Sequence, residues 1–398
     1  MLLRKNYFFA HQGIRFTFYE LRRTFKKLLL FIVMISVVNG CGGIQLQHSF
    51  VREQNFLRFP SLEPPLEKIF EISVVAGFPK DAGTLQDSVL FIGTLNGEVK
   101  AYNIFTEKSY GYFDAGNAVA GAPLVEGNRV IVPVANDKHS LFAYNFAERK
   151  TEWKIQLGDI ETKPLLTENA IIVLTVESKL IAVKKHSGEI LWTFKPKTKK
   201  KGSRAFSSPV CDSTRIYFGN DDGMLYAVDA DSGYLAWSFQ MEGSMLASPV
   251  IDSLYLYCTT TAGKCYSFLR SFEIDIWTYD AGVPLYGGVG VNSNFVFLPS
   301  SDGKITALRK REGTKVWEYQ TSSGINTAPV ANEKNIFFGT LDRNIFALDV
   351  KNGTMMWKFP LEGRVKTNLI AWNDCLVAFV EDRTVMVFQT PKNIAKKK

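Results

Sequence analysis

Three observations on the sequence predict an all-β fold, an eight-bladed β-propeller built from four-stranded antiparallel blades. A unit of about 40 residues recurs eight times along the chain. Each unit contains four short apolar runs separated by turn-forming residues, and the final unit lacks its fourth run. A matching run precedes the first unit. A ring of eight sheets, closed by pairing the first segment with the last blade, accommodates all three observations.

The repeat is defined by three columns of residues. A small or apolar residue recurs at steps of 42, 39, 45, 40, 40, 40 and 40 residues, at Ala101, Ala143, Ala182, Ala227, Ser267, Ala307, Ala347 and Val387. A second column holds Gly111 and then Trp153, Trp192, Trp237, Trp277, Trp317 and Trp357. A third column opens the units with Gly83, Pro123, Pro164, Pro209, Pro249, Val289, Pro329 and Leu369. A fixed period near 40 is typical of stacked units that cannot bury their apolar faces alone.

The unit at residues 247–280 shows how one blade is built. Its sequence, ASPVIDSLYLYCTTTAGKCYSFLRSFEIDIWTYD, alternates runs rich in Val, Ile, Leu, Tyr and Phe with turn signals such as DS and TAG. This pattern predicts short antiparallel strands. Glycines such as Gly223 and Gly303 supply the positive φ that a tight hairpin requires. The tryptophans are expected to fill the gaps between blades rather than to bind a ligand.

The ring is predicted to close through the two ends of the repeat region. The last unit stops at Thr390 after three strands, and residues 67–75 (EKIFEISVV) supply the missing fourth strand. We therefore assign residues 67–390 to the propeller and residues 391–398 to a basic tail. The ordering entropy of such a long-range pairing is recovered only when the ring is complete, so closure is expected to govern stability.

Residues 1–40 have the pattern of an export signal. Basic residues precede the apolar run LLLFIVMISVV, whose eleven residues are too few to cross a bilayer core. The following NGC, with Gly40 and Cys41, completes a resemblance to a bacterial lipobox. This implies a lipoprotein signal peptide that is cleaved before Cys41, whose thiol is then acylated. Cleavage without acylation is the alternative.

Two further features of the N-terminal region leave alternatives open. The pair Arg22 and Arg23 allows either ordinary or twin-arginine export, and the long basic region allows an internal start codon. Residues 41–66 show no strand alternation and contain Pro60, Pro64 and Pro65. They are predicted to form a flexible tether that holds the propeller near a membrane surface.

The net charge of +8 does not indicate nucleic-acid binding. Residues 1–40 carry seven Lys or Arg residues against one Glu, so +6 of the charge lies in the signal region and +2 remains. Nucleic-acid binding requires a basic surface that neutralises phosphates. We therefore expect no nucleic-acid partner.

The repeat, with SPV…YFGNDDGMLYAVDADSGYLAWSF as its best copy, resembles the units of eight-bladed quinoprotein-like propellers. The resemblance covers about 320 residues and leads to two branches. One comprises quinoprotein alcohol dehydrogenases. The other is the BamB family, lipoprotein subunits of the machinery that folds β-barrels into bacterial outer membranes. A shared fold does not decide between them.

The enzyme branch would imply a calcium site, a catalytic aspartate, a tryptophan beneath the quinone and commonly two adjacent cysteines. This chain has no adjacent cysteines, and His48, His139 and His186 stand apart from carboxylate-rich motifs. The Asn220–Asp222 stretch is a hairpin turn or, alternatively, a ligand for a hard cation. We expect no catalytic residue, no metal and no cofactor.

The BamB branch implies contacts between loops that lead into the SPV-type strands and the POTRA domains of a barrel-inserting protein. An arginine five residues before one proline takes part in that family, and Arg204 precedes Pro209 by five residues here. The family's acidic pair falls at Ser244 and Leu246, so that feature is missing.

The loop that contains Arg204 is strongly basic. Its cationic residues are Lys195, Lys197, Lys199, Lys200, Lys201 and Arg204, and Phe206 follows them. We predict a partner-binding site at Lys199, Lys200, Lys201, Arg204 and Phe206, for an acidic protein surface or anionic lipid headgroups. A solvated surface loop is the alternative.

Cysteine spacing leaves one pairing open. Cys258 and Cys265 flank a hairpin and are either free or bonded across the strands, whereas Cys211 and Cys375 belong to distant blades and should not pair.

Together these features predict a lipid-anchored outer-membrane protein that faces the periplasm. It would act as a non-enzymatic scaffold in outer-membrane barrel assembly, a monomer within a complex that includes a POTRA-bearing partner. A quinone-dependent dehydrogenase-like propeller and a surface lipoprotein with an unknown ligand are the alternatives.

Overall fold

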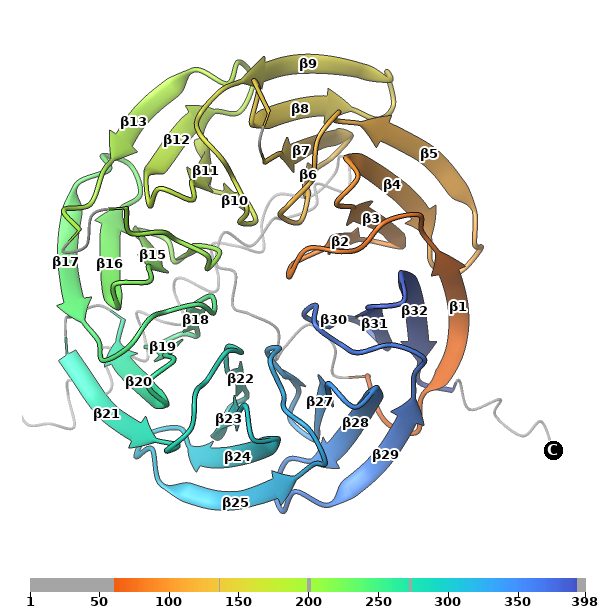
Figure 1. Cartoon of the computed structure of the whole chain (residues 1–398), viewed down its shortest axis with the longest axis vertical. Helices are drawn as coiled ribbons and strands as arrows, with labels where there is room; N and C mark the ends of the chain where they lie inside the picture. Colours follow the sequence, from red (N-terminus) through yellow and green to blue (C-terminus); the bar gives the residue numbers. More distant parts are fainter. Residues whose placement is uncertain (1–60, 136, 199–201, 271, 273, 392–398) are drawn as a thin grey trace, which may run out of the picture. The chain divides into compact units, whose positions relative to one another are not determined.

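The computed structural model describes residues 61–391 except 136, 199–201, 271 and 273. This part of the chain contains 32 strands in eight four-stranded antiparallel sheets, arranged as a ring of blades (Figure 1). The predicted fold class is therefore confirmed. A helix of the length and apolarity needed to span a membrane does not occur within these residues.

Each blade uses four strands that are consecutive in the chain, except the eighth. Blade 1 comprises β2 (Gly83–Gln86), β3 (Val89–Gly93), β4 (Glu98–Asn103) and β5 (Ser109–Asp114). Blade 2 comprises β6 (Leu124–Glu126), β7 (Arg129–Pro133), β8 (Leu141–Asn145) and β9 (Lys150–Ile155). Blades 3 and 4 comprise β10 (Leu165–Leu166), β11 (Ala170–Leu174), β12 (Leu180–Lys184), β13 (Ile190–Phe194), then β14 (Val210–Cys211), β15 (Arg215–Gly219), β16 (Met224–Asp229) and β17 (Leu235–Gln240).

The second half of the ring repeats this order. Blades 5 and 6 comprise β18 (Val250–Ile251), β19 (Tyr255–Thr259), β20 (Lys264–Leu269), β21 (Ile274–Asp280), then β22 (Gly290–Val291), β23 (Phe295–Pro299), β24 (Lys304–Arg309) and β25 (Lys315–Gln320). Blade 7 comprises β26 (Val330–Ala331), β27 (Asn335–Gly339), β28 (Asn344–Asp349) and β29 (Met355–Pro360). Blade 8 comprises β30 (Ile370–Trp372), β31 (Cys375–Val380), β32 (Thr384–Gln389) and, as its fourth strand, β1 (Glu67–Ser73).

The two ends of the ring carry different connections. We call one end the loop face; it carries the links from the fourth strand of each blade to the first strand of the next, and the turns between second and third strands. The other end, the turn face, carries the turns between first and second strands and between third and fourth strands. Backbone bonds such as Met241 N to Gly223 O (2.8 Å) join the two kinds of loop-face segment.

The sequence columns become cross-strand pairs in the sheets. Ala227 lies opposite Trp237, and Ala347 lies opposite Trp357. The second and third strands are buried, because each is covered on both faces by neighbouring blades, whereas the fourth strands are partly exposed. Repeated register thus places the same residue type at the same depth in successive blades.

The tryptophans join consecutive blades, as predicted. The Trp317 indole N–H donates to Val350 O (2.9 Å), and the Trp277 indole N–H donates to Lys310 O (3.0 Å). Beneath the ring of Trp317 lies Gly353, where an added Cβ would come within 2.6 Å of the indole. The turn that begins the next fourth strand therefore needs glycine for space as well as for its φ of 72°.

The ring closes where the sequence predicts. Strand β1 pairs antiparallel with β32, and Phe70 lies opposite Val387 at the position that tryptophan takes in other blades. Phe70 is buried and packs against Tyr102 of blade 1 with ring centroids 6.3 Å apart. The opening strand thus completes blade 8, as Figure 1 shows.

One segment differs from the prediction. Residues 61–66, assigned to the flexible tether, pack against blades 7 and 8, where Leu62 and Leu66 are buried. The Leu62 carbonyl accepts from Asn332 Nδ2 (2.8 Å), and the Glu63 N–H donates to Thr390 Oγ1 (2.8 Å). Blade 8 has no covalent turn between its third and fourth strands, and this segment covers the gap left by that missing turn.

The strand register decides the open cysteine pairing. Cys258 lies opposite Tyr266, whereas Cys265 lies opposite Thr259. Successive side chains alternate between sheet faces, so the two thiols point to opposite sides of blade 5 and cannot bond without a register shift. Cys258 and Cys265 are free, all four described cysteines are buried, and burial raises the pKa of the Cys258 thiol.

We expect Gly353→Ala to destabilise the propeller more than Gly282→Ala. Both glycines have a φ near 70°, but an added Cβ at Gly282 meets no atom within 4 Å. The backbone cost of about 1 kcal/mol is therefore shared, and overpacking against Trp317 adds about 1–3 kcal/mol at Gly353 alone. Urea denaturation measures the difference, and equal losses would contradict the packing role of the tryptophan.

We expect Leu62→Ala to lower the free energy of unfolding by about 2–5 kcal/mol, because a fully buried leucine leaves a cavity. Val75→Ala is the control, since Val75 is exposed and should change stability by less than about 0.5 kcal/mol. Guanidinium denaturation of the two variants checks this. A Leu62→Ala denaturation curve that matched wild type would show that residues 61–66 do not stabilise the propeller and belong to the tether.

Candidate functional site: the loop face

Arg204 and Phe206 lie on the loop face, in the link between blades 3 and 4. The Arg204 N–H donates to Asp221 Oδ1 (2.8 Å), and the Arg204 carbonyl accepts from the Asp221 N–H (2.9 Å). The hydroxyl of Ser203 donates to the same carboxylate oxygen (2.8 Å). The Arg204 backbone is therefore fixed by the turn between the second and third strands of blade 4.

The Arg204 side chain is exposed and placed over an aromatic ring. Its guanidinium carbon lies 5.1 Å from the centroid of the Phe206 ring, which is itself half-buried. This distance is within the range of a cation–π contact. The guanidinium is thus held in place while its planar donor group stays open to a partner.

The predicted site is only partly described by the structure. Lys199, Lys200 and Lys201 lie outside the described residues, as does Cys41. Lys195 and Lys197, which precede the three lysines, are exposed. The structure therefore brings Arg204 and Phe206 together and leaves the contribution of the lysines as a prediction.

The Asn220–Asp222 stretch forms a turn. Asn220 Oδ1 accepts from the Met224 N–H (3.0 Å), which is the usual way an asparagine closes a hairpin. Sequence reasoning missed that Asp221 also fixes Arg204. The sequence held two signals for this contact, the NDD stretch and the arginine five residues before Pro209. Their contact could not be predicted, because it depends on how the link from blade 3 approaches blade 4.

The two positions of the missing acidic pair hold neutral residues with structural roles. The Ser244 N–H donates to Thr261 Oγ1 (3.0 Å) and its hydroxyl donates to the Asp221 carbonyl (2.8 Å). The carbonyl of Leu246 accepts from Lys80 Nζ (3.1 Å). These residues bind neighbouring loops together and offer no carboxylate to a partner.

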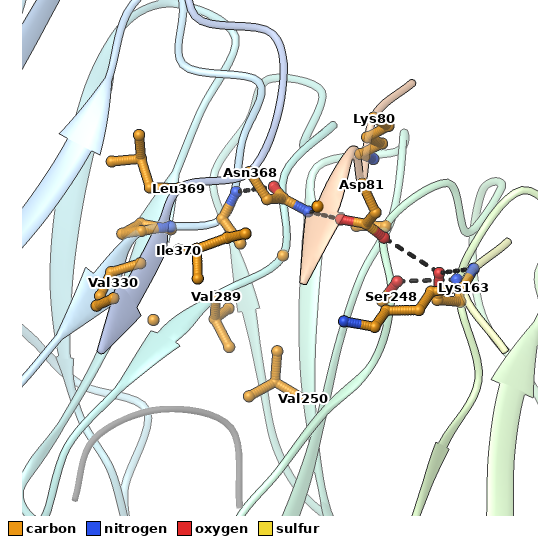
Figure 2. A pocket seen from close by; sticks show the side chains of 18 of the residues that line it. Lys80, Asp81, Lys163, Ser248, Val250, Val289, Val330, Asn368, Leu369 and Ile370 are labelled. Carbon is orange, nitrogen blue, oxygen red and sulfur yellow. Dashed lines mark hydrogen bonds between the residues drawn. The ribbon is translucent and has the colours of Figure 1, made fainter. Parts of the chain in front are cut away.

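Lys80 and Asp81 lie at the loop-face end of the central channel, and Figure 2 shows the hydrogen bond that joins Asp81 to Asn368. They belong to the link between β1 and β2, yet the Lys80 ammonium donates to Leu246 O and Tyr286 O on the opposite side of the ring, both at 3.1 Å. Asp81 accepts from Asn368 Nδ2 (2.7 Å) and from Ser208 Oγ (3.1 Å). We call this pair the channel brace, because it joins links from both halves of the ring.

The brace covers a cavity of about 250 Å³. Polar groups line its mouth, and apolar side chains line the channel below, among them Val250, Val289, Val330 and Ile370 (Figure 2). Burial lowers the pKa of Lys80, and the charge of Asp81 partly opposes that shift. The sequence signal for the brace was Asp81, two residues before Gly83, where the other units carry Gly, Ala, Ser or Thr.

The channel does not fit a metal-dependent quinone cofactor. The Lys80 side chain spans the space that a planar ring on the axis would need. Within the described residues, no group of three or more His, Cys, Asp or Glu side chains could hold a metal ion. The arrangement can brace loops, and the described residues that line the channel bring no nucleophile and base together.

The ring and its repeats place the chain among the eight-bladed propellers built from quinoprotein-type units. The family model described as outer membrane protein assembly factor BamB matches residues 67–175, 134–244, 176–270 and 274–395. The chain belongs to this family.

Curated relatives match over part of their length. The BamB protein of Yersinia pestis is 23% identical over 234 residues, 55% of this chain and 58% of that protein. A quinone alcohol dehydrogenase subunit of Gluconobacter oxydans is 31% identical over 106 residues, 24% of this chain and 14% of the relative. The alignments thus span less than two thirds of these relatives.

Solved structures share the fold. The crystal structure of BamB from Moraxella catarrhalis has a TM-score of 0.72 at 19% identity and covers 82% of this chain and all of that one (100%). The quinohemoprotein alcohol dehydrogenase of Comamonas testosteroni has a TM-score of 0.69 at 13% identity, covering 81% of this chain and 76% of that one. Both likenesses concern the ring of blades.

We expect Lys80→Met to change how stability depends on pH. Because burial lowers the folded-state pKa, unfolding takes up a proton between that lowered pKa and the ordinary lysine value of about 10.4. Above the ordinary lysine pKa the amine is neutral in both states, so burying Lys80 carries no charge penalty and its full contribution to stability is present. That contribution is lost as pH falls through the folded-state pKa, because the buried amine must then become charged. Relative to Lys80→Met, wild type should gain stability as pH rises from neutral toward 10.

Urea denaturation across that pH range measures this effect. Lys351→Met is the matched control, since Lys351 is exposed on the turn face. A constant stability difference between wild type and Lys80→Met would show that the ammonium carries no burial penalty.

Proposed function

We propose that this protein is a non-enzymatic scaffold of outer-membrane β-barrel assembly that binds POTRA domains of a barrel-inserting protein through its loop face. Membership in the BamB family supports the role in assembly. The proposal includes a lipid on Cys41 that anchors the chain to the outer membrane, facing the periplasm. The protein would act as one copy within a complex.

The observation that carries this proposal is the fixed presentation of Arg204. Both its backbone N–H and its backbone carbonyl are bonded to Asp221, and its guanidinium lies over Phe206. An arginine that is already ordered loses less side-chain entropy on binding, a cost of about 0.5–1.5 kcal/mol per immobilised side chain. Arginine and aromatic residues are also the types that most often dominate interface energies.

The channel supports a scaffold rather than an enzyme. Lys80 is engaged by two backbone carbonyls, and Asp81 by an amide and a hydroxyl. Both charged groups are therefore committed to holding loops together. A dehydrogenase would need such groups available to a substrate or a cofactor.

We expect Arg204→Glu to weaken binding of a POTRA-bearing barrel-assembly protein by at least about tenfold, which corresponds to about 1.4 kcal/mol. Co-purification and a titration with the purified POTRA domains measure this. Lys351→Glu makes the same charge reversal on the turn face and should bind like wild type. If Arg204→Glu bound the POTRA domains as tightly as wild type, the loop face would not be the partner-binding surface.

The same titration tests the basic loop. Reversing the charges of Lys199, Lys200 and Lys201 should lower the affinity and flatten its dependence on salt, because the lysines steer an acidic partner. If the affinity of this variant depended on salt as that of wild type does, the three lysines would belong to a solvated loop that does not contact the partner.

A further inference from the structure

The turn face carries exposed apolar side chains at the ends of consecutive blades. Tyr234 of blade 4 is 77% exposed, and Leu254 and Phe272 of blade 5 are 55% and 59% exposed. Leu254 lies in the turn between first and second strands, and Phe272 lies between third and fourth strands of the same blade. A third aromatic tip, Phe105 of blade 1, is 46% exposed.

These tips are held outward by their backbones. The Leu254 N–H donates to Asp252 Oδ1 (2.8 Å), and the Leu254 carbonyl accepts from the Arg270 N–H (2.9 Å). The Tyr234 carbonyl accepts from the Asp229 N–H (2.8 Å). The turns are thus fixed within their own blades, and the three apolar side chains are exposed at their tips.

The charged groups beneath the tips are paired with each other. Lys310 lies 2.7 Å from the fully buried Asp252, and Arg270 lies 3.4 Å from Asp212. These ion pairs link blade 5 to blades 6 and 4. The charge beneath Leu254 and Phe272 is therefore paired, and Asp231 is an exposed carboxylate in the same turn as Tyr234.

The chain enters the propeller on this same face. Glu63 lies next to Lys334 and Thr390, both at turn-face ends of blades 7 and 8. Ser61 lies 20 positions after Cys41, a span of at most about 70 Å when fully extended. If Cys41 carries the lipid, as the proposed function holds, the bilayer lies within reach of the turn face.

We propose that the turn face of blades 4 and 5 rests on the lipid bilayer through Tyr234, Leu254 and Phe272. Tyrosine suits the boundary between headgroups and acyl chains, where an amphipathic ring meets water, and phenylalanine and leucine suit insertion among the acyl chains. The contribution of each side chain is small, and the tether adds to it by raising the effective concentration of the face at the membrane. The loop face then points away from the bilayer toward its protein partner.

The test uses residues 41–398 with Cys41→Ser, so that no lipid is attached, and measures co-sedimentation with vesicles of phosphatidylethanolamine and phosphatidylglycerol. Combined Tyr234→Ser, Leu254→Ser and Phe272→Ser should reduce vesicle binding by about tenfold. The control combines Leu95→Ser and Val75→Ser, two exposed apolar residues of the loop face. Thermal melting of each variant confirms that the ring remains folded.

Three outcomes would overturn the proposal. The first is no vesicle binding by the unmodified face, and the second is an equal loss in the control variant. The third is binding that disappears at high salt or with neutral phosphatidylcholine vesicles, because apolar contact persists under both conditions. POTRA binding by the same turn-face variant should match wild type, so this test and the Arg204→Glu titration can fail separately.

Discussion

The pairing of β1 with β32 is the contact on which the ring depends. Phe70 and Val387 are more than 300 residues apart in the sequence, and bringing such distant positions together costs on the order of 5 kcal/mol of chain entropy. The pairing recovers this cost because it completes blade 8 and thereby covers both blade 7 and blade 1. Residues 61–66 extend the closure by covering the end of blade 8 where no covalent turn exists.

The repeat explains why so much of the fold could be predicted from the sequence. The alanine and tryptophan columns must lie opposite each other in every blade, since a slip of one residue would turn each side chain to the wrong face. In four blades the tryptophan also meets a glycine of the next blade, as Trp317 meets Gly353. The pairing of a small residue with tryptophan recurs in six blades, so the pattern stays readable where one unit departs from it. The cysteine pairing, by contrast, depended on the register of a single hairpin, which spacing alone does not give.

Contacts that break the repeat could not be predicted in the same way. Lys80 and Asp81 occur once, and their partners Leu246, Tyr286 and Asn368 lie in links far apart in the sequence. Only the size and curvature of the finished ring decide which residues face each other across the channel. The same limit applies to Leu62, whose proline-rich surroundings read as a tether although its side chain is buried in the packing between blades.

The brace also bears on how Arg204 is presented. The link that carries Arg204 continues to Ser208, whose hydroxyl donates to Asp81 and whose N–H donates to Ser248 Oγ (2.8 Å). Residues 204–208 are thus bonded to Asp221 at one end and to Asp81 and Ser248 at the other. A short segment fixed at both ends has few conformations to lose on binding. These bonds make this part of the loop face rigid, as the proposed binding of a protein partner through Arg204 requires.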